Sequence, residues 1–139
     1  MTQEEKDLLL KDLCARLRHK VRIKIGEYSD YTLIGIVVTD EQPIKVEVIE
    51  SGISYKIEVS PDIVKPYLRP MSSMTEEEKK EFYYIGGVLS VDFEFETYKM
   101  VHLLKSHNVI DWLNEHHFDY RGLIEKNLAL DCTGLHIYD

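Results

Sequence analysis

The amino-acid sequence predicts an α+β protein, because the spacing of its apolar residues differs between three stretches of the chain. Up to residue 18, apolar residues recur every three or four positions, as in an amphipathic helix. From residue 21 to residue 59 they alternate with polar residues, as in half-buried strands. After residue 75 the helical spacing returns, with one alternating stretch inside it. We therefore expect a helix, a group of short strands and a helix-rich second half.

The first helix is predicted over residues 3–18. Thr2 and Glu5 have the spacing of a capping box, in which a hydroxyl and a carboxylate satisfy free backbone N–H groups at a helix start. The predicted buried stripe of this helix consists of Leu9, Leu10, Leu13, Cys14 and Leu17.

Alternation and turn signals predict strands over 21–25, 31–39, 44–48, 53–59 and 67–69. Gly35 predicts a bend or bulge in the second strand, and Ser51-Gly52 predicts a tight hairpin turn. One helical turn is expected from Ser60 to Asp62. Short antiparallel strands linked by hairpins, with a single helical turn before the last, resemble a small SH3-like barrel. This resemblance implies a first domain over residues 1–70, made of the helix and the barrel. A twisted meander of the same strands, packed on the first helix, fits the pattern equally well.

Residues 71–139 are predicted to form an α-rich lobe with one or two strands, after a linker over 71–74. Thr75 and Glu78 repeat the capping-box spacing and predict a helix to about Ile85. The patterns that follow predict a strand over 88–96, helices over 108–117 and 119–128, and an extended tail over 132–139. The apolar spacing over 97–105 fits a helix or a strand, and a helix is favoured.

The bulk properties exclude several classes of protein. The 139 residues include no apolar run long enough to cross a membrane, and the polar start has no apolar core of a signal peptide. Cys14 and Cys132 lie far apart, which indicates reduced thiols and not a disulfide framework. We therefore expect a cytoplasmic protein without a membrane segment.

The net charge of −8 is unevenly distributed between the halves of the chain. Residues 1–70 hold 11 Lys and Arg against 12 Asp and Glu, whereas residues 71–139 hold 6 against 13. A nucleic-acid-binding protein concentrates positive charge, and the second half does the opposite. In the first half, positive charge is concentrated in a basic segment over residues 16–24, which contains Arg16, Arg18, Lys20, Arg22 and Lys24. Small barrels bind nucleic acids through such segments, although aromatic residues for base stacking are not interleaved here. The segment could equally form salt bridges with the acidic second half, within one molecule or between copies.

A second group of polar residues lies near the predicted break between the last two helices. His116 and His117 are neighbours in sequence and point about 100° apart on a helix, so one metal site could rarely use both. No metal-ligand spacing accompanies them, and we expect no metal and no cofactor. His117, Asp119 and Arg121 could contact an anion or a partner, but no nucleophile motif accompanies them, so no catalytic residue is assigned and no enzyme is predicted.

Two stretches carry a family resemblance, Lys65 to Glu78 and Asp111 to Lys126. The second contains Asp-Trp-Leu-Asn and, two residues later, His-His-Phe-Asp-Tyr-Arg-Gly-Leu-Ile-Glu-Lys. With the opening helix, they resemble a group of uncharacterised proteins from phages and prophages of gut anaerobic bacteria. This resemblance implies a mobile-element origin and a cytoplasmic location in an infected host; it supplies no site residues.

The function predicted from these features is that of a non-enzymatic accessory protein that binds a protein partner. The alternative is a nucleic-acid-binding SH3-like module that uses the basic segment.

Overall fold

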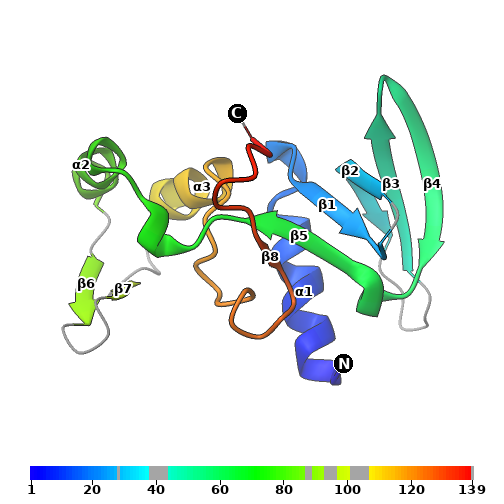
Figure 1. Cartoon of the computed structure of the whole chain (residues 1–139), viewed down its shortest axis with the longest axis horizontal. Helices are drawn as coiled ribbons and strands as arrows, with labels where there is room; N and C mark the ends of the chain where they lie inside the picture. The colour runs from blue at the N-terminus through cyan, green and yellow to red at the C-terminus, as the bar shows by residue number, and fades with distance from the viewer. Residues whose placement is uncertain (28, 38–43, 87–88, 93–96, 101–106, 139) are drawn as a thin grey trace.

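The computed structural model describes residues 1–27, 29–37, 44–86, 89–92, 97–100 and 107–138 (Figure 1). Its helices are α1 (Gln3–Ala15), α2 (Glu76–Tyr84) and α3 (His107–Glu115). The strands are β1 (Arg22–Ile25), β2 (Ser29–Val37), β3 (Ile44–Glu50), β4 (Ile53–Val59), β5 (Val64–Leu68), β6 (Leu89–Asp92), β7 (Thr97–Met100) and β8 (Leu130–Asp131). Three short 3₁₀ turns are η1 (Leu17–His19), η2 (Pro61–Ile63) and η3 (Met71–Ser73).

The main sheet has six strands in the order β4-β3-β2-β1-β5-β8. All neighbouring strands are antiparallel except β5 and β8, which are parallel. The predicted α+β class is therefore confirmed. The sheet is open, with β4 and β8 at its edges, and no ladder joins these edges within the described residues. The closed barrel expected from the alternation is not observed.

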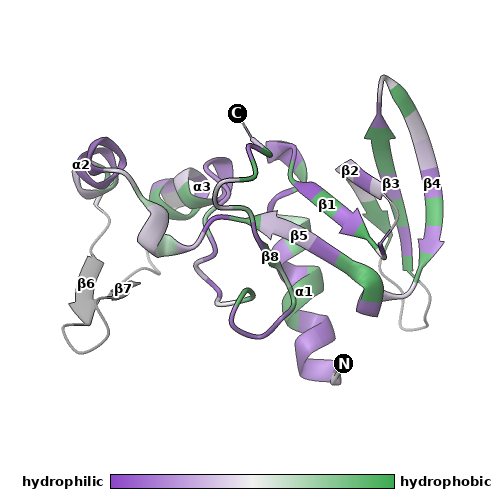
Figure 2. Cartoon of the chain, viewed as in Figure 1, coloured by the Kyte–Doolittle hydropathy of each residue, from purple (hydrophilic) through white to green (hydrophobic). Residues whose placement is uncertain are grey.

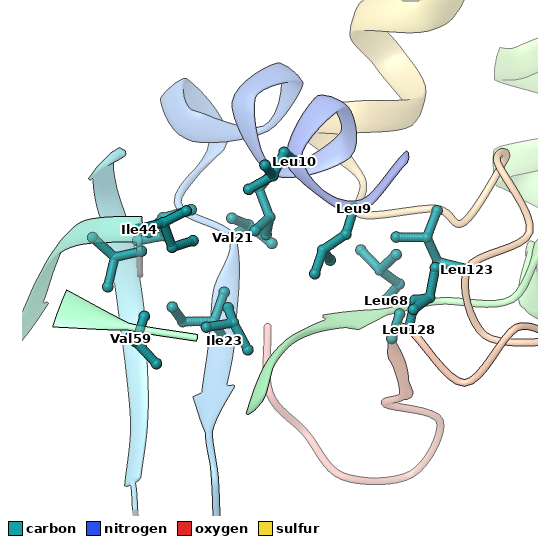
Figure 3. Close-up of a cluster of buried hydrophobic side chains, with 14 of the residues drawn as sticks. Leu9, Leu10, Val21, Ile23, Ile44, Val59, Leu68, Leu123 and Leu128 are labelled. Atoms are coloured by element: carbon teal, nitrogen blue, oxygen red, sulfur yellow. The ribbon is translucent and has the colours of Figure 1, made fainter. Parts of the chain in front are cut away.

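Helix α1 lies against this sheet and buries its apolar side there (Figures 1 and 3). The Thr2 hydroxyl oxygen accepts a hydrogen bond from the Glu5 N–H at 3.1 Å, as the capping spacing predicts. Leu9, Leu10 and Leu13 are buried as expected, but Cys14 is exposed, so its assignment to the buried stripe is wrong. The helix ends at Ala15, before the predicted end at residue 18, because η1 takes over the chain.

The strands follow the predicted pattern closely. The ladder between β2 and β3 shifts register between Leu33 and Gly35, which confirms the predicted bulge. The turn from β3 to β4 contains Ser51 and Gly52, both at positive φ, which is the geometry of a tight two-residue hairpin. Inward-facing residues of the strands and α1 form an aliphatic core that we call the sheet cluster (Figure 3).

A second core lies between α2 and α3, and we call it the aromatic cluster. The Trp112 ring centroid lies 5.4 Å from that of Phe82 and 5.7 Å from that of Phe118. The remaining buried members are Met74, Val109 and Leu113. Helix α2 starts with the predicted capping box, because Thr75 and Glu78 exchange both hydrogen bonds.

The helix predicted over 119–128 is wrong, and the segment 97–105, for which a helix was favoured over a strand, is a strand where the structure describes it. Residues 97–100 form β7, which pairs with β6 in a two-stranded sheet. The stretch 119–128 consists of turns and leads into β8. Its tertiary contacts override the helical spacing, because Leu123, Leu128 and Ala129 pack into the sheet cluster and β8 must pair with β5. Of the strand predicted over 88–96, residues 89–92 form β6, which confirms it for these residues. Residues 88 and 93–96 of that strand, and 101–105 of the segment 97–105, lie outside the described residues.

The extended tail predicted over 132–139 is wrong for residues 132–138, which form turns and bends after β8; residue 139 lies outside the described residues. The predicted domain boundary falls between β5 and η3, although residues of the second half contribute to the sheet cluster. No helix among the described residues has the length and apolar character that a membrane span requires.

Candidate functional site: a polar groove beside a buried ion network

A groove with a volume of about 600 Å³ lies beside the end of β5. Its walls come from four separate segments: the residue after β5, the η3–α2 junction, the end of α3 and the tail after β8. The lining residues that carry the argument are Arg69, Glu78, Glu115, His117, Cys132 and Tyr138. We call this feature the polar groove.

One wall of the polar groove is held by an ion pair between Arg69 and Glu78. Two guanidinium nitrogens donate to the two carboxylate oxygens at 2.8 and 2.7 Å, a bidentate arrangement. Burial favours the protonated carboxyl, but hydrogen bonds from Arg69 and the Thr75 backbone outweigh it and lower the pKa of Glu78 to about 2. The Arg69 guanidinium also lies 4.2 Å from the Phe118 ring centroid, which ties this wall to the aromatic cluster.

A second wall is held by Tyr138. Its ring stacks on the His117 ring with centroids 3.6 Å apart. Its hydroxyl donates to the Tyr67 carbonyl at 2.6 Å and accepts from the Arg22 N–H at 2.9 Å. The tail is therefore fastened to both β5 and β1 by a single side chain.

His117 occupies a strained backbone position, with a φ of 63°. Two backbone hydrogen bonds fix the adjacent chain, from Arg69 N–H to the His117 carbonyl and from Asp119 N–H to the Arg69 carbonyl, both 2.8 Å. Burial, followed by the nearby charge of Arg16, lowers the pKa of His117 to about 3, so the ring is neutral at pH 7. Its Nδ1 atom is buried and has no hydrogen-bond partner within the described part of the chain.

Asp119 and Arg121 do not line the groove, which corrects the prediction that they form one contact group with His117. Asp119 is buried, and its carboxylate accepts the N–H groups of Leu123 and Ile124, each at 2.9 Å. It caps a turn, although not the predicted helix. Burial raises its pKa. Arg121 points to a different partner, the Asp12 carboxylate in α1, at 2.8 Å.

Asp12 is the centre of a buried ion network that also contains Arg16 and Arg121. Arg16 donates from Nε to Asp12 at 2.9 Å and from Nη2 to the Phe118 carbonyl at 2.6 Å. Asp12 and Arg16 are both 0% exposed. This network joins α1 to the segment that follows α3.

The basic segment is therefore not one continuous surface. Arg16 cannot meet a nucleic acid because it is buried in the ion network, whereas Arg18 and Lys20 are exposed. Arg22 and Lys24 lie half-buried on β1, where Arg22 donates to the Thr32 hydroxyl at 3.0 Å. The prediction that all five residues share one contact surface is wrong for Arg16, and the remaining four stay a prediction.

Arg69, Glu78 and Tyr138 were not identified as site residues from the sequence. The capping box pointed to Glu78 only as a helix start, and charges nine positions apart across a linker carry no contact signal. Tyr138 is 71 residues from its carbonyl partner.

The protonation states of the groove indicate what it can do chemically. Glu78 is a carboxylate and His117 a neutral ring at pH 7, and neither pKa lies near neutrality. These groups suit hydrogen bonding more than proton transfer. No group of three His, Cys, Asp or Glu side chains in the described ranges is arranged to hold a metal ion.

Comparison of the chain with protein-family models, with curated proteins and with solved structures found no match.

Proposed function

We propose that this chain is a non-enzymatic accessory protein, of phage or prophage type, that acts in the cytoplasm by binding a protein partner. A polypeptide segment of the partner would occupy the polar groove. The five strands β1–β5 would be a divergent, open relative of an SH3-like barrel. Their order β4-β3-β2-β1-β5 and the 3₁₀ turn η2 before β5 support that relationship.

The observation that carries the proposal is that two walls of the groove are fixed before any ligand arrives. The Arg69–Glu78 pair holds one wall, and Tyr138 holds another through three contacts. A preorganised site loses less conformational entropy on binding. Most of the lining residues have side chains that can hydrogen-bond, whereas most of the surface they expose to the groove is apolar. The groove is large enough for several of a partner's residues, and this mixed lining suits a polypeptide segment with both polar and apolar groups.

The displaced pKa values favour binding over catalysis. A general acid or base works best when its pKa lies near the operating pH. Glu78 at about 2 and His117 at about 3 keep one protonation state throughout the neutral range.

Helix α2 adds aromatic surface outside the groove. Tyr83 and Tyr84 are 78% and 89% exposed, respectively, on the helix whose first turn contributes Glu78 to the groove. Tyrosine is enriched in protein interfaces because its ring buries a large area and its hydroxyl still forms hydrogen bonds. These two residues are therefore available as anchors for the same partner.

The test is affinity capture from a host lysate, with and without nuclease, followed by mass spectrometry. The tag belongs at the N-terminus, because the tail forms a wall of the groove. Glu115→Arg places a long cation at the groove rim, and Glu125→Arg makes the same change at an exposed residue that does not line the groove. We expect a nuclease-resistant protein whose recovery falls about tenfold with Glu115→Arg and is unchanged with Glu125→Arg.

Equal recovery with both variants would contradict the proposed use of the groove. If only nucleic acid and nuclease-sensitive proteins were recovered, the alternative would be favoured, namely nucleic-acid binding through Arg18, Lys20, Arg22 and Lys24.

A further inference from the structure

Strand β4 has a free outer edge. Within the described residues it hydrogen-bonds only to β3, through an unbroken ladder from Ile44–Val59 to Glu50–Ile53. Edge strands are commonly protected by short length, a proline, a bulge or charged side chains. With seven residues, no proline and no register shift, β4 lacks the first three protections, and its charges, Lys56 and Glu58, are of opposite sign. Its backbone is therefore suited to pairing with another strand.

The hairpin geometry shows which backbone groups are free. Residues that flank a two-residue turn form a hydrogen-bonded pair, so Ile53 directs its N–H and C=O towards β3. Every second residue after Ile53 also directs its backbone N–H and C=O towards β3. The backbone N–H and C=O of the residues between them point away from β3, out of the edge of the sheet. Ser54, Lys56 and Glu58 therefore present the free donors and acceptors at the edge.

Strand β4 also presents exposed apolar side chains on one face, and its alternation is visible in Figure 2. Ile53 and Tyr55 are 57% and 45% exposed. Tyr55 pairs with Val48, which is fully buried, so Tyr55 lies on the core-facing side of the sheet. An added strand would cover part of this surface.

The opposite face of the β3–β4 hairpin carries charges in a regular order. Lys45 pairs with Glu58, with 3.7 Å between the ammonium nitrogen and the carboxylate oxygen, and Glu47 pairs with Lys56. Each cross-strand row therefore contains one positive and one negative charge. Opposite charges directly across a ladder stabilise it, and like charges destabilise it.

We infer that two copies of this chain associate through β4, antiparallel, with the two-fold axis at Ile57. In this register Lys56 of each copy faces Glu58 of the other. Each row across the four strands then runs Lys45 and Glu58 of one copy, followed by Lys56 and Glu47 of the second copy, so positive and negative charges alternate. A register centred on Lys56 would oppose two like charges. This surface is distinct from the polar groove, so dimer formation does not depend on the function proposed above.

The test compares single charge reversals with their mixture by sedimentation of the full chain. Lys56→Glu and Glu58→Lys each create two like-charge contacts in the homodimer, and we expect each to weaken dimer formation about tenfold or more. In an equimolar mixture, the two acidic residues of one variant face the two lysines of the other. The heterodimer should therefore form at least as well as the wild-type dimer, whose Kd we expect in the micromolar range.

Glu125→Lys, an exposed reversal outside the sheet, is the matched control and should dimerise like the wild type. Thermal unfolding of each variant separates loss of pairing from loss of folding. A wild-type chain that stays monomeric at near-millimolar concentration would overturn the inference. So would folded single variants that dimerise normally, or a mixture that does not restore dimers.

Discussion

The two hydrophobic clusters of this molecule are built from different side chains and in different ways. The sheet cluster contains the buried aliphatic residues of α1 and the strands, for example Leu13, Ile23 and Leu33. The aromatic cluster is centred on stacked rings, those of Phe82, Trp112 and Phe118. The sheet cluster depends on the regular spacing of apolar residues within each helix and strand. The aromatic cluster depends on rings brought together from α2, α3 and the chain that follows α3, so no spacing of residues along the sequence predicts its contacts.

The buried ion network lies between these clusters and connects them. Asp12 lies in α1, which supplies Leu9 and Leu13 to the sheet cluster, and Arg16 directly follows this helix. Arg16 donates a hydrogen bond to the carbonyl of Phe118 in the aromatic cluster. We therefore expect a substitution in the buried ion network to destabilise both clusters, whereas a substitution in a wall of the polar groove should destabilise mainly the aromatic cluster.

The largest effect is expected from Asp12→Ala. This change leaves Arg16 as a buried charge without its carboxylate, which typically costs about 3–5 kcal/mol in the free energy of unfolding. Urea denaturation measures this loss, and hydrogen exchange should show faster exchange in both clusters. Glu4→Ala, at an exposed site in the same helix, is the control. A loss below about 1 kcal/mol would show that the network does not connect the clusters.

A smaller effect is expected from Glu78→Gln. The amide cannot accept both charge-assisted bonds from Arg69, so the free energy of unfolding should fall by about 1.5–3 kcal/mol. Because the pKa of Glu78 is lowered, its carboxylate stabilises the fold above pH 4.5, and this contribution is lost as the pH falls towards 2. The variant should therefore lose less stability than the wild type over that interval. Glu77→Gln, exposed in the same turn, should behave like the wild type in acid.

The smallest effect is expected from His117→Asn, and it is a change in how the free energy of unfolding depends on pH. Because the folded protein resists protonation of this ring, the unfolded chain binds a proton as the pH falls below 6.5 and stability decreases towards pH 3. Between pH 7 and pH 5 the wild type should lose on the order of 1–2 kcal/mol through this group. His117→Asn tolerates the positive φ and should remove that slope, as followed by urea denaturation at the two pH values. His136→Asn, also at positive φ but exposed, should retain the slope; an unchanged slope in His117→Asn would contradict the assignment.

The comparison of the clusters also explains how far the sequence could predict the molecule. The strands from β1 to β4 and the bulge at Gly35 follow from alternation and turn residues, which act over a few positions. The turns over 119–128 could not be predicted, because the pairing of Leu130 with Tyr67 and the packing of Leu123 override a helical pattern.

Most of the candidate site was also beyond prediction. His117 was identified as a polar residue near a turn, but its neighbours in the groove come from segments distant in sequence. Arg16 was assigned to a surface because no sequence pattern places the Phe118 carbonyl 102 residues downstream against it. Long-range polar contacts of this kind depend on the tertiary fold and not on local spacing.

The parallel pairing of β5 with β8 has a consequence for synthesis on the ribosome. The first five strands leave the exit tunnel well before residues 118–131 have been translated, since chain elongation proceeds at about 5–20 residues per second. During that interval the nascent chain lacks the carbonyl that Arg16 requires and the strand that covers the edge of β5. The β5–β8 pair and the hydrogen bond from Arg16 to the Phe118 carbonyl can therefore form only after residues 118–131 have emerged from the ribosome.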